Sequence, residues 1–316
     1  MKLRGIDLGN VFAASGSLNF LGEGYWFHKY LKILTLGLSS FSGATFIAKT
    51  TPYDPNPGNM PLNRKLQPRE WRPKCIWVDP LKKIALNSVG LTSPGAEYLF
   101  RRNVWQNLRK PFGLSFMAIK ATKEERLEEA RKYCALLKKE LPRFKAPIFL
   151  QINVSCPNTR HSPRELIREA LELLQIFSVL SIPLDLKLNI AADLKLLKEI
   201  QASGLCDVVT CSNTILFGWF PEKINWNKLF PQGSPLSDLG GGGLSGSPVF
   251  PLVIGWCRRM REGGITMPLK LSNGIIYPHQ VDIVEKAGGN AIELGSIDFI
   301  RPLNIKRIIN RVNLLW

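Results

Sequence analysis

Short apolar runs alternate with longer amphipathic stretches along most of the chain. Runs of four to eight residues, rich in β-branched and aliphatic side chains, predict buried strands. They cover residues 11–16, 44–51, 114–119, 148–154, 184–188, 207–211, 269–272 and 291–294. Helical spacing lies between them, at residues 24–36, 122–141, 163–180, 193–203, 248–261, 278–287 and 304–313. Eight strands, each followed by a helix or a long segment, predict an α/β fold, and a (β/α)8 TIM barrel in particular.

An open, doubly wound sheet is the alternative α/β arrangement. That fold normally places its glycine-rich phosphate turn after the first strand. Here the glycine-rich signals come late, at Gly246, at Asn273-Gly274 and at Gly295-Ser296. Phosphate loops next to strands seven and eight are typical of the barrel, so their position favours that fold.

Two long segments interrupt the alternation, at residues 52–113 and 215–247. Prolines exclude long regular elements from the first segment, but its apolar runs predict short strands at residues 75–78 and 83–87. Neither segment offers a second hydrophobic core, and long loops in compact domains are usually functional. We therefore expect residues 1–316 to form a single domain, with the two segments as loop insertions around the active site.

The composition is that of an ordinary globular protein, with 316 residues, 45% hydrophobic and 21% charged. Six cysteines without paired spacing predict neither disulfides nor a metal site and suit a cytoplasmic location. No apolar run follows the first positive charges, so no secretory signal is expected. The most apolar stretch, residues 31–47, is broken by Lys32, glycines and serines and predicts no integral membrane segment.

The formal net charge is +17. Such a surplus attracts nucleic acid, anionic membranes or anionic metabolites, but dispersed basic residues also fit an ordinary solvated surface. Lys49, Lys120 and Lys187 differ from the rest because they fall near the ends of predicted strands, and Lys49 and Lys187 are the cationic candidates for the site. A lysine there binds an anion or stabilises charge that develops on a cofactor, and the alternative is an ion pair with a neighbouring carboxylate.

The strand at residues 148–154 leads into a polar loop that contains Asn153, Cys156 and Asn158. Barrel enzymes place their chemistry at the C-terminal ends of strands. A lone cysteine is more often a buried apolar residue, but the two amides beside Cys156 favour a proton-handling role. A thiol acts as a base when positive charge or hydrogen-bond donors lower its pKa.

Four asparagines at predicted strand ends or loops, Asn87, Asn153, Asn158 and Asn213, offer donors and acceptors without charge. A pyrimidine ring with alternating C=O and N–H edges requires this mixture, although each asparagine alone is common in turns.

The late glycines predict a phosphate site, because backbone N–H groups near helix N-termini bind phosphate. Any one of them alone is more often a turn residue. A phosphate-bearing redox cofactor and a base together predict removal of a hydride and a proton from adjacent carbons.

Several ordered motifs resemble the dihydroorotate dehydrogenase family over essentially the whole chain. They are Ala-Ser-Gly, Ala-Lys-Thr-Thr, Pro-Gly-Asn-Met-Pro, Leu-Asn-Ser-Val-Gly-Leu, Asn-Val-Ser-Cys-Pro-Asn-Thr, Gly-Leu-Ser-Gly and Leu-Gly-Ser. The resemblance implies an FMN-binding (β/α)8 barrel that oxidises dihydroorotate to orotate in de novo pyrimidine (UMP) biosynthesis. A cysteine in the active-site loop resembles the soluble, class 1 members, whereas the membrane-bound class uses serine and an N-terminal helical extension.

The resemblance also implies roles for residues. Cys156 would take the C5 proton while FMN takes the C6 hydride, and Lys187 would stabilise the reduced flavin, so both are expected to be catalytic. The residues expected to bind the substrate are Lys49, Asn87, Gly90, Leu91, Asn153, Asn158, Asn213 and Thr214. Those expected to bind FMN are Ala14, Ser15, Lys49, Thr50, Asn153, Lys187, Gly246, Gly274, Gly295 and Ser296.

Some alternatives stay open. The run Leu271-Ser272-Asn273-Gly274 stands where the family is richer in glycine, which bears on the phosphate contact at Asn273. Two other functions stay possible from the sequence. One is that of a related FMN barrel reductase, similar to dihydropyrimidine dehydrogenase or tRNA dihydrouridine synthase. The other is that of a catalytically silent FMN- or nucleic-acid-binding protein.

The expected partners are dihydroorotate, orotate and a second copy in a homodimer. The electron acceptor is fumarate, a quinone, or NAD through an iron–sulfur subunit.

Overall fold

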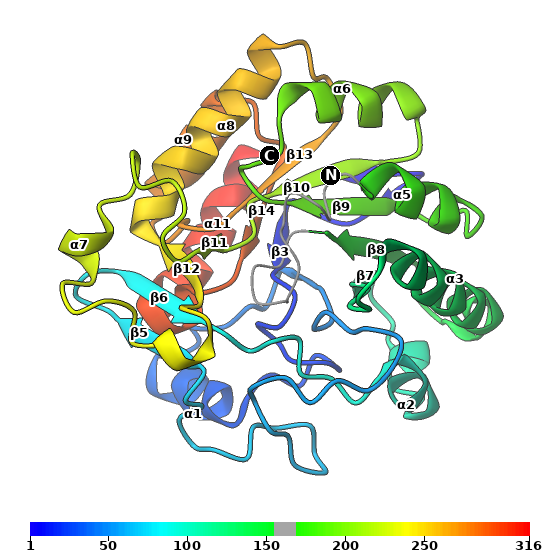
Figure 1. Ribbon diagram of the computed structural model, residues 1–316, viewed down its shortest axis with the longest axis horizontal. Helices are drawn as coiled ribbons and strands as arrows, with labels where there is room; N and C mark the ends of the chain where they lie inside the picture. The colour runs from blue at the N-terminus through cyan, green and yellow to red at the C-terminus, as the bar shows by residue number, and fades with distance from the viewer. Residues whose placement is uncertain (155–168) are drawn as a thin grey trace.

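The computed structural model describes residues 1–154 and 169–316. Within these residues, eight parallel strands form the central sheet and helices surround it (Figure 1). The strands are β3 (Val11–Ala13), β4 (Thr45–Phe46), β7 (Phe112–Phe116), β8 (Ile148–Asn153), β9 (Leu184–Leu188), β10 (Val208–Cys211), β13 (Leu269–Ser272) and β14 (Ala291–Leu294). All eight coincide with predicted strands: β9, β13 and β14 match the predicted bounds, β3, β4, β8 and β10 are shorter, and β7 begins and ends earlier than predicted.

The central sheet closes on itself. Its strand order is β4-β3-β14-β13-β10-β9-β8-β7, and parallel bridges from Ile47 to Gly113 and from Thr51 to Phe116 join the two edge strands. Closure removes the exposed edges and turns every strand's C-terminal end toward one face. The predicted (β/α)8 barrel is therefore confirmed.

The helices follow the strands as the amphipathic stretches predicted. The longer ones are α1 (Trp26–Leu34), α3 (Lys123–Glu140), α5 (Ala170–Ser178), α6 (Leu194–Ser203), α8 (Phe250–Glu262), α9 (His279–Lys286) and α11 (Ile305–Leu315). The shorter ones are α2 (Ala96–Arg101), α7 (Trp226–Leu229) and α10 (Ile297–Ile300), and the 3-10 turns are η1 (Trp105–Asn107), η2 (Leu141–Arg143), η3 (Ser237–Leu239), η4 (Ser247–Val249) and η5 (Pro302–Asn304).

Local capping explains where two of these helices begin. At α3 the Thr122 hydroxyl accepts from the Glu125 N–H, and the Glu125 carboxylate accepts from the Thr122 N–H. This is the capping box that the sequence predicts. At α6 the Asp193 side chain accepts from the Leu196 N–H, which is a single N-cap bond without the reciprocal partner.

The two long segments pair with each other, which the sequence did not predict. β5 (Ile76–Asp79) and β6 (Ile84–Asn87) come from the first, and β11 (Ile215–Leu216) and β12 (Gly243–Gly246) from the second. They form one antiparallel sheet in the order β11-β12-β6-β5, with Gly243 opposite Asn87 (Figure 1). The predicted strands at residues 75–78 and 83–87 are confirmed, and this sheet stands beside the barrel mouth.

An unpredicted hairpin, β1 (Lys2–Leu3) and β2 (Ile6–Asp7), lies at the other end of the barrel. Leu3 and Leu8 pack there with Phe12, Phe149 and neighbouring strand residues in a separate buried cluster. Since these are the N-terminal ends of the strands, the hairpin closes the barrel on the side away from the mouth. Among the described residues, no helix combines the length and the hydropathy needed to cross a bilayer.

Candidate active site

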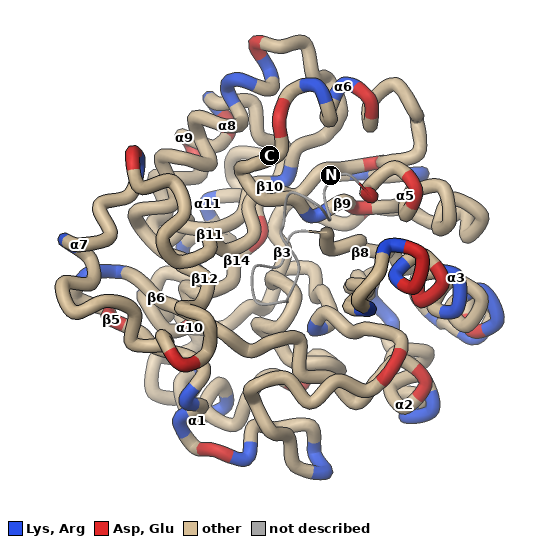
Figure 2. The backbone as a smooth tube through the Cα atoms, in the orientation of Figure 1, with Lys and Arg blue, Asp and Glu red and all other residues tan. Residues whose placement is uncertain are grey.

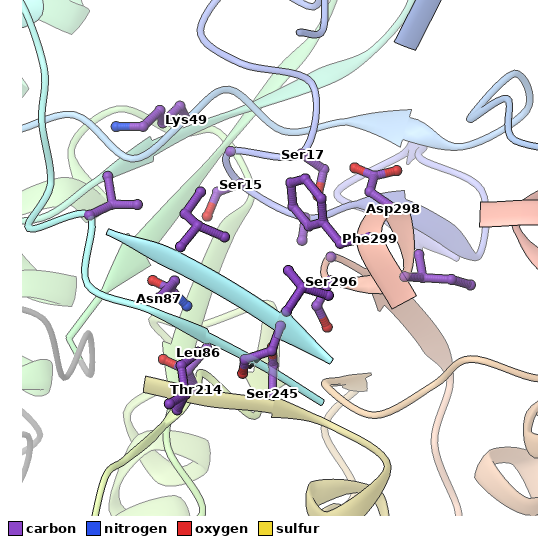
Figure 3. Close-up of a pocket in the computed structure, with 18 of the residues that line it drawn as sticks. Ser15, Ser17, Lys49, Leu86, Asn87, Thr214, Ser245, Ser296, Asp298 and Phe299 are labelled. Carbon is purple, nitrogen blue, oxygen red and sulfur yellow. Dashed lines mark hydrogen bonds between the residues drawn. The ribbon is translucent and has the colours of Figure 1, made fainter. Parts of the chain in front are cut away.

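A cavity of about 890 Å³ lies at the C-terminal ends of the barrel strands. Predicted site residues from both barrel and loops line it: Ala14, Ser15, Lys49, Thr50, Asn87, Gly90, Leu91, Asn153, Lys187, Asn213, Thr214, Gly274, Gly295 and Ser296. Figure 3 shows part of this lining, with Lys49 at one end and Asp298 and Phe299 at the other. Cys156 and Asn158 lie outside the described residues.

A chain of hydrogen bonds crosses the mouth of the barrel. The Asn213 side chain donates to Asn153 Oδ1 at 3.0 Å, and Asn153 Nδ2 lies 3.5 Å from Thr50 Oγ1. Thr50 in turn donates to Ser15 Oγ at 3.1 Å. Four strand ends therefore hold one another's polar groups at fixed positions, and the Asn213–Asn153 bond sets the orientation of both amides.

Lys49 is buried beside this chain. Its ammonium group donates to the Thr92 carbonyl and lies 4.7 Å from the centre of the Phe20 ring. A cation in such a dry site binds an anionic ligand more strongly than one in water does. Lys49 therefore suits the carboxylate of a small substrate.

The loop that carries Asn87, Gly90 and Leu91 is held by the proline-rich segment, residues 52–73, which contains six prolines. Asn56 Nδ2 donates to the carbonyls of Gly90 and Leu91, at 2.7 and 3.1 Å. Asn59 Nδ2 donates to the Ser88 carbonyl at 2.7 Å, and its N–H donates to Val89. Sequence reasoning missed Asn56 and Asn59 as positioning residues, although the Pro-Gly-Asn-Met-Pro motif marks their segment.

Lys187 belongs to a buried network beneath the cavity. Its ammonium group pairs with Glu293, whose other oxygen lies 3.2 Å from Lys270 Nζ. Lys270 also pairs with Asp185 at 2.7 Å, and Gln151 Nε2 donates to both carboxylates at 2.9 Å. Lys187 therefore forms the ion pair that was the alternative interpretation, and it also lines the cavity, where its role toward a cofactor stays a prediction.

The opposite charges in this network stabilise one another's ionised forms. Burial by itself raises the pKa of Glu293, but the ammonium groups of Lys187 and Lys270 outweigh burial and lower that pKa to about 2. Glu293 is therefore ionised at neutral pH and stabilises the positive charge of Lys187. Glu293 and Lys270 were not singled out from the sequence, because each looks like an ordinary strand residue.

The predicted phosphate end is built from tight backbone turns. Gly274 has a φ of +78°, and a Cβ there would lie 2.7 Å from the Phe250 nitrogen. Gly295 faces Ala14, and Ser296 precedes α10. Only glycine fits at Gly274, because a side chain there would meet the Phe250 nitrogen and the Gly246 carbonyl oxygen, and this close approach fixes the turn that lines the cavity.

Gly246 differs from the other predicted phosphate residues. It does not line the cavity, and its N–H donates to Asn273 Oδ1 at 3.1 Å. The Asn273 side chain also reaches the Asn213 carbonyl, at 3.3 Å. Asn273 thus ties β12 to the ends of β10 and β13, which accounts for a polar side chain in this turn.

The far end of the cavity is aromatic, which the sequence did not predict. Tyr25, Trp26 and Phe27 from the start of α1 and Trp71 from the proline-rich segment line it. The Tyr25 hydroxyl donates to the Gly16 carbonyl at 2.8 Å. The run Tyr25-Trp26-Phe27 was the available signal, but it was interpreted only as part of a helix.

The cavity fits a flavin mononucleotide. Its volume lies within the range of cofactor sites, about 300–1,000 Å³. At one end, Gly274, Gly295 and Ser296 offer backbone N–H groups for a phosphate. Ala14 and Ser15 leave room for a flat ring against the backbone, and Lys187 supplies a positive charge at the barrel's centre.

Comparisons with known proteins agree with this geometry. A family model described as dihydroorotate dehydrogenase matches residues 43–313. The catalytic subunit of dihydroorotate dehydrogenase B (NAD(+)) from Listeria welshimeri is 24% identical over 99% of this chain and 91% of its own length. Dihydroorotate dehydrogenase A (fumarate) from Lactobacillus delbrueckii subsp. bulgaricus is 27% identical over 98% of this chain and 90% of its own length.

The same fold occurs in a solved structure. Ligand-free DHODH from Eimeria tenella superposes with a TM-score of 0.68 and 17% identity, covering 100% of this chain and 87% of its own. The family match spans most of the chain, and the barrel and its cavity have the arrangement that the motifs predicted. The chain belongs to the dihydroorotate dehydrogenase family, whose members are FMN-containing oxidoreductases that act on a CH–CH bond.

Proposed function

We propose that this chain oxidises dihydroorotate to orotate in pyrimidine biosynthesis. The observation that carries the proposal is the convergence of Lys49, Asn87, Asn153 and Asn213 on one cavity. These residues come from separate strands and loops, and together they offer one cation and three amides. That set matches a pyrimidine ring with one carboxylate better than it matches a nucleic acid, whose binding would require several phosphate contacts.

The substrate-binding residues act by orientation. Lys49 would bind the carboxylate, while Asn87, Asn153 and Asn213 would bind the alternating C=O and N–H groups. The hydrogen bond between Asn213 and Asn153 fixes these amides before the substrate arrives. Gly90, Leu91 and Thr214 would supply further contacts at the same end, and preorganised contacts of this kind hold a reacting carbon in position.

Lys187 would act at the other face of the substrate, near FMN. FMN, when bound, supplies the two-electron acceptor for the oxidation. Lys187 would hold a positive charge where negative charge develops. Its ion pair with Glu293 keeps the ammonium group in place, and Lys270 holds the other oxygen of the same carboxylate.

Cys156 is proposed as the base that removes the C5 proton. It follows Asn153 by three positions in the chain, directly after β8. We expect Cys156→Ser to slow anaerobic bleaching of the bound flavin by dihydroorotate strongly at neutral pH, because a hydroxyl is a much weaker base than a thiolate. Stopped-flow absorbance measures the rate, and bleaching at the wild-type rate would remove Cys156 from the mechanism.

The function is tested with the purified protein. Its flavin should be FMN, and dihydroorotate should bleach it without oxygen. Each candidate acceptor, fumarate, a quinone or an NAD-linked iron–sulfur partner, is then added to find which restores the colour. Flavin bleaching by dihydrouracil in place of dihydroorotate would contradict the proposal. Absence of bleaching with every dihydropyrimidine would contradict it as well.

We also propose a single cytoplasmic domain that assembles as a homodimer. One hydrophobic cluster joins residues from Val11 to Val312, which supports a single domain. The described cysteines are all free thiols, as in a reducing compartment. Analytical ultracentrifugation tests the homodimer, because a monomer would sediment distinctly more slowly.

A further inference from the structure

Helix α1 presents a row of apolar side chains to solvent. Trp26, Tyr30, Ile33 and Leu34 are spaced as one face of a helix, and their exposed fractions are 38%, 62%, 65% and 79%. Leu36, just beyond the helix, is 94% exposed. A stripe with this spacing normally packs against the protein core, yet α1 contains no buried residue.

The helix cannot turn this stripe inward, because its other side is already engaged. Phe27 and Leu31 line the cavity, and His28 Nε2 lies 3.3 Å from the buried Asp298 carboxylate. Phe27 also contacts the Phe299 ring at 5.6 Å between centroids. Two apolar sides on one helix indicate two apolar environments, one of which is outside the molecule.

A second segment enlarges the exposed surface. The Trp71 ring stacks on Trp26 with 5.3 Å between centroids, and Trp71 is 66% exposed. We call Trp26, Tyr30, Ile33, Leu34, Leu36 and Trp71 the α1 patch. Contiguous exposed patches of large apolar side chains mark protein or membrane contacts.

Positive charges predominate beside the α1 patch, with Glu70, the neighbour of Trp71 in the chain, as an acidic exception. Lys29 and Lys32 are exposed on α1, and the Arg72 guanidinium lies 5.1 Å from the centre of the Trp71 ring. Figure 2 shows basic residues along α1, which carries no acidic residue. None of the ion pairs among the described residues includes Lys29, Lys32 or Arg72.

We propose that the α1 patch docks on an anionic lipid bilayer, with α1 lying in the plane of the interface. Tryptophan and tyrosine prefer the headgroup level, Ile33 and Leu34 would enter the acyl boundary, and flanking lysines would contact anionic headgroups. A second copy fits this surface less well. In a two-fold contact the patch would meet itself, and the lysines of both copies would approach one another.

This docking is independent of the reaction proposed for the cavity. Trp26 and Trp71 border the aromatic end of the cavity as well, but Tyr30, Ile33, Leu34 and Leu36 do not line it, and the expected substrate-binding groups Lys49, Asn87, Asn153 and Asn213 are not part of the patch. The inner side of α1 lines the aromatic end of the cavity, so that end of the cavity would face the bilayer.

The test is sedimentation of the full-length protein with vesicles of phosphatidylcholine, with and without phosphatidylglycerol. The wild type should bind vesicles that contain phosphatidylglycerol, and added salt should weaken the binding. The double variant Ile33→Ser/Leu34→Ser should bind at least about tenfold more weakly, because two apolar side chains no longer leave water. Leu314→Ser is the control, since Leu314 is 81% exposed and lies near the C-terminus, far from α1 (Figure 1).

The charge contribution is tested separately. Lys29→Glu/Lys32→Glu should lose binding to phosphatidylglycerol vesicles. The control, Lys195→Glu/Lys198→Glu on the distant α6, changes the net charge by the same amount and should keep most of the vesicle binding. Equal losses in both pairs would show that only total charge matters and would overturn the proposal.

Two other results would overturn it. One is absence of wild-type binding to phosphatidylglycerol vesicles. The other is a change from dimer to monomer in Ile33→Ser/Leu34→Ser without vesicles, which would assign the patch to a subunit interface. The unfolding temperature of each variant is measured as well, and it should stay unchanged because these side chains are exposed.

Discussion

At the scale of single residues, Glu293 has the most demanding environment. Its side chain is fully buried between Lys187 and Lys270. Two buried ammonium groups require a carboxylate between them, because an uncompensated buried charge is costly. Glu293 is therefore expected to contribute to the stability of the barrel and to hold the Lys187 ammonium group in place.

We predict that Glu293→Gln lowers the free energy of unfolding by about 3–5 kcal/mol, the usual effect of removing one partner of a buried pair. Urea unfolding followed by circular dichroism measures the change. Glu285→Gln, at an exposed position on α9, is the control and should change little. Equal stability of the two variants would contradict the role of Glu293.

The same residue predicts a pH dependence. The pKa of Glu293 is about 2 in the folded protein against an ordinary value of 4.5, so its contribution is complete above pH 4.5 and is lost as the pH falls toward 2. The stability difference between wild type and Glu293→Gln should shrink over that interval. A difference that stays constant between these pH values would contradict the depressed pKa.

Gly274 is a second residue whose identity the structure requires. Gly274→Ala should cost more stability than Gly240→Ala and should release FMN, measured by flavin absorbance after gel filtration. Gly240 has a similar φ, +79° against +78°, but a Cβ there meets nothing within 4 Å. The control therefore carries only the left-handed strain, about 1–2 kcal/mol, and equal losses would show that the clash near Phe250 is unimportant.

At the scale of elements, the proline-rich segment positions the substrate loop. Asn56 and Asn59 hydrogen-bond to carbonyls between Ser88 and Leu91, so the loop's shape depends on a segment about thirty positions earlier. Neither asparagine lines the cavity. They act on the substrate through the loop and not by contact.

We predict that Asn59→Ala raises the KM for dihydroorotate about fivefold to tenfold, corresponding to one hydrogen bond of roughly 1 kcal/mol. FMN content should stay at the wild-type level, because Gly274 and Ser296 lie elsewhere. Asn225→Ala removes the cap of α7 instead, and it should leave KM unchanged. Loss of FMN together with substrate affinity would indicate general unfolding and contradict the positioning role.

At the scale of the whole molecule, the barrel separates a reactive end from a structural end. The cavity lies at the C-terminal ends of the strands, whereas the β1–β2 hairpin and Leu8 close the N-terminal ends. Stability and function can therefore be changed separately.

Leu8→Ala should lower the free energy of unfolding by about 2–5 kcal/mol, because it opens a cavity in a buried cluster. The rate of flavin bleaching by dihydroorotate should remain near the wild-type value at moderate temperature. Leu81→Ala, at a position that is 92% exposed, serves as the control. An equal effect of both substitutions would show that the hairpin does not close the barrel.

Much of this molecule follows from local sequence. Apolar runs such as residues 148–154 and 184–188 set the barrel strands, and the capping box at Thr122 sets the start of α3. Once the strands are parallel, Lys49, Asn153 and Lys187 must meet at one face, because all strand ends open there. For these reasons the sequence by itself determined the barrel, its family and the polar residues of the barrel mouth that line the cavity, such as Lys49, Asn153 and Lys187.

Contacts between distant parts of the chain needed the tertiary structure. Three such contacts join segments that are separated by tens to more than a hundred positions. They are the pairing of β6 with β12, the hydrogen bond between Gly246 and Asn273, and the Lys187–Glu293–Lys270 network. The same is true of the exposed stripe on α1, whose spacing predicts a buried face. Periodicity shows that a side of a helix is apolar, but only the packed barrel decides which side finds a partner within the molecule.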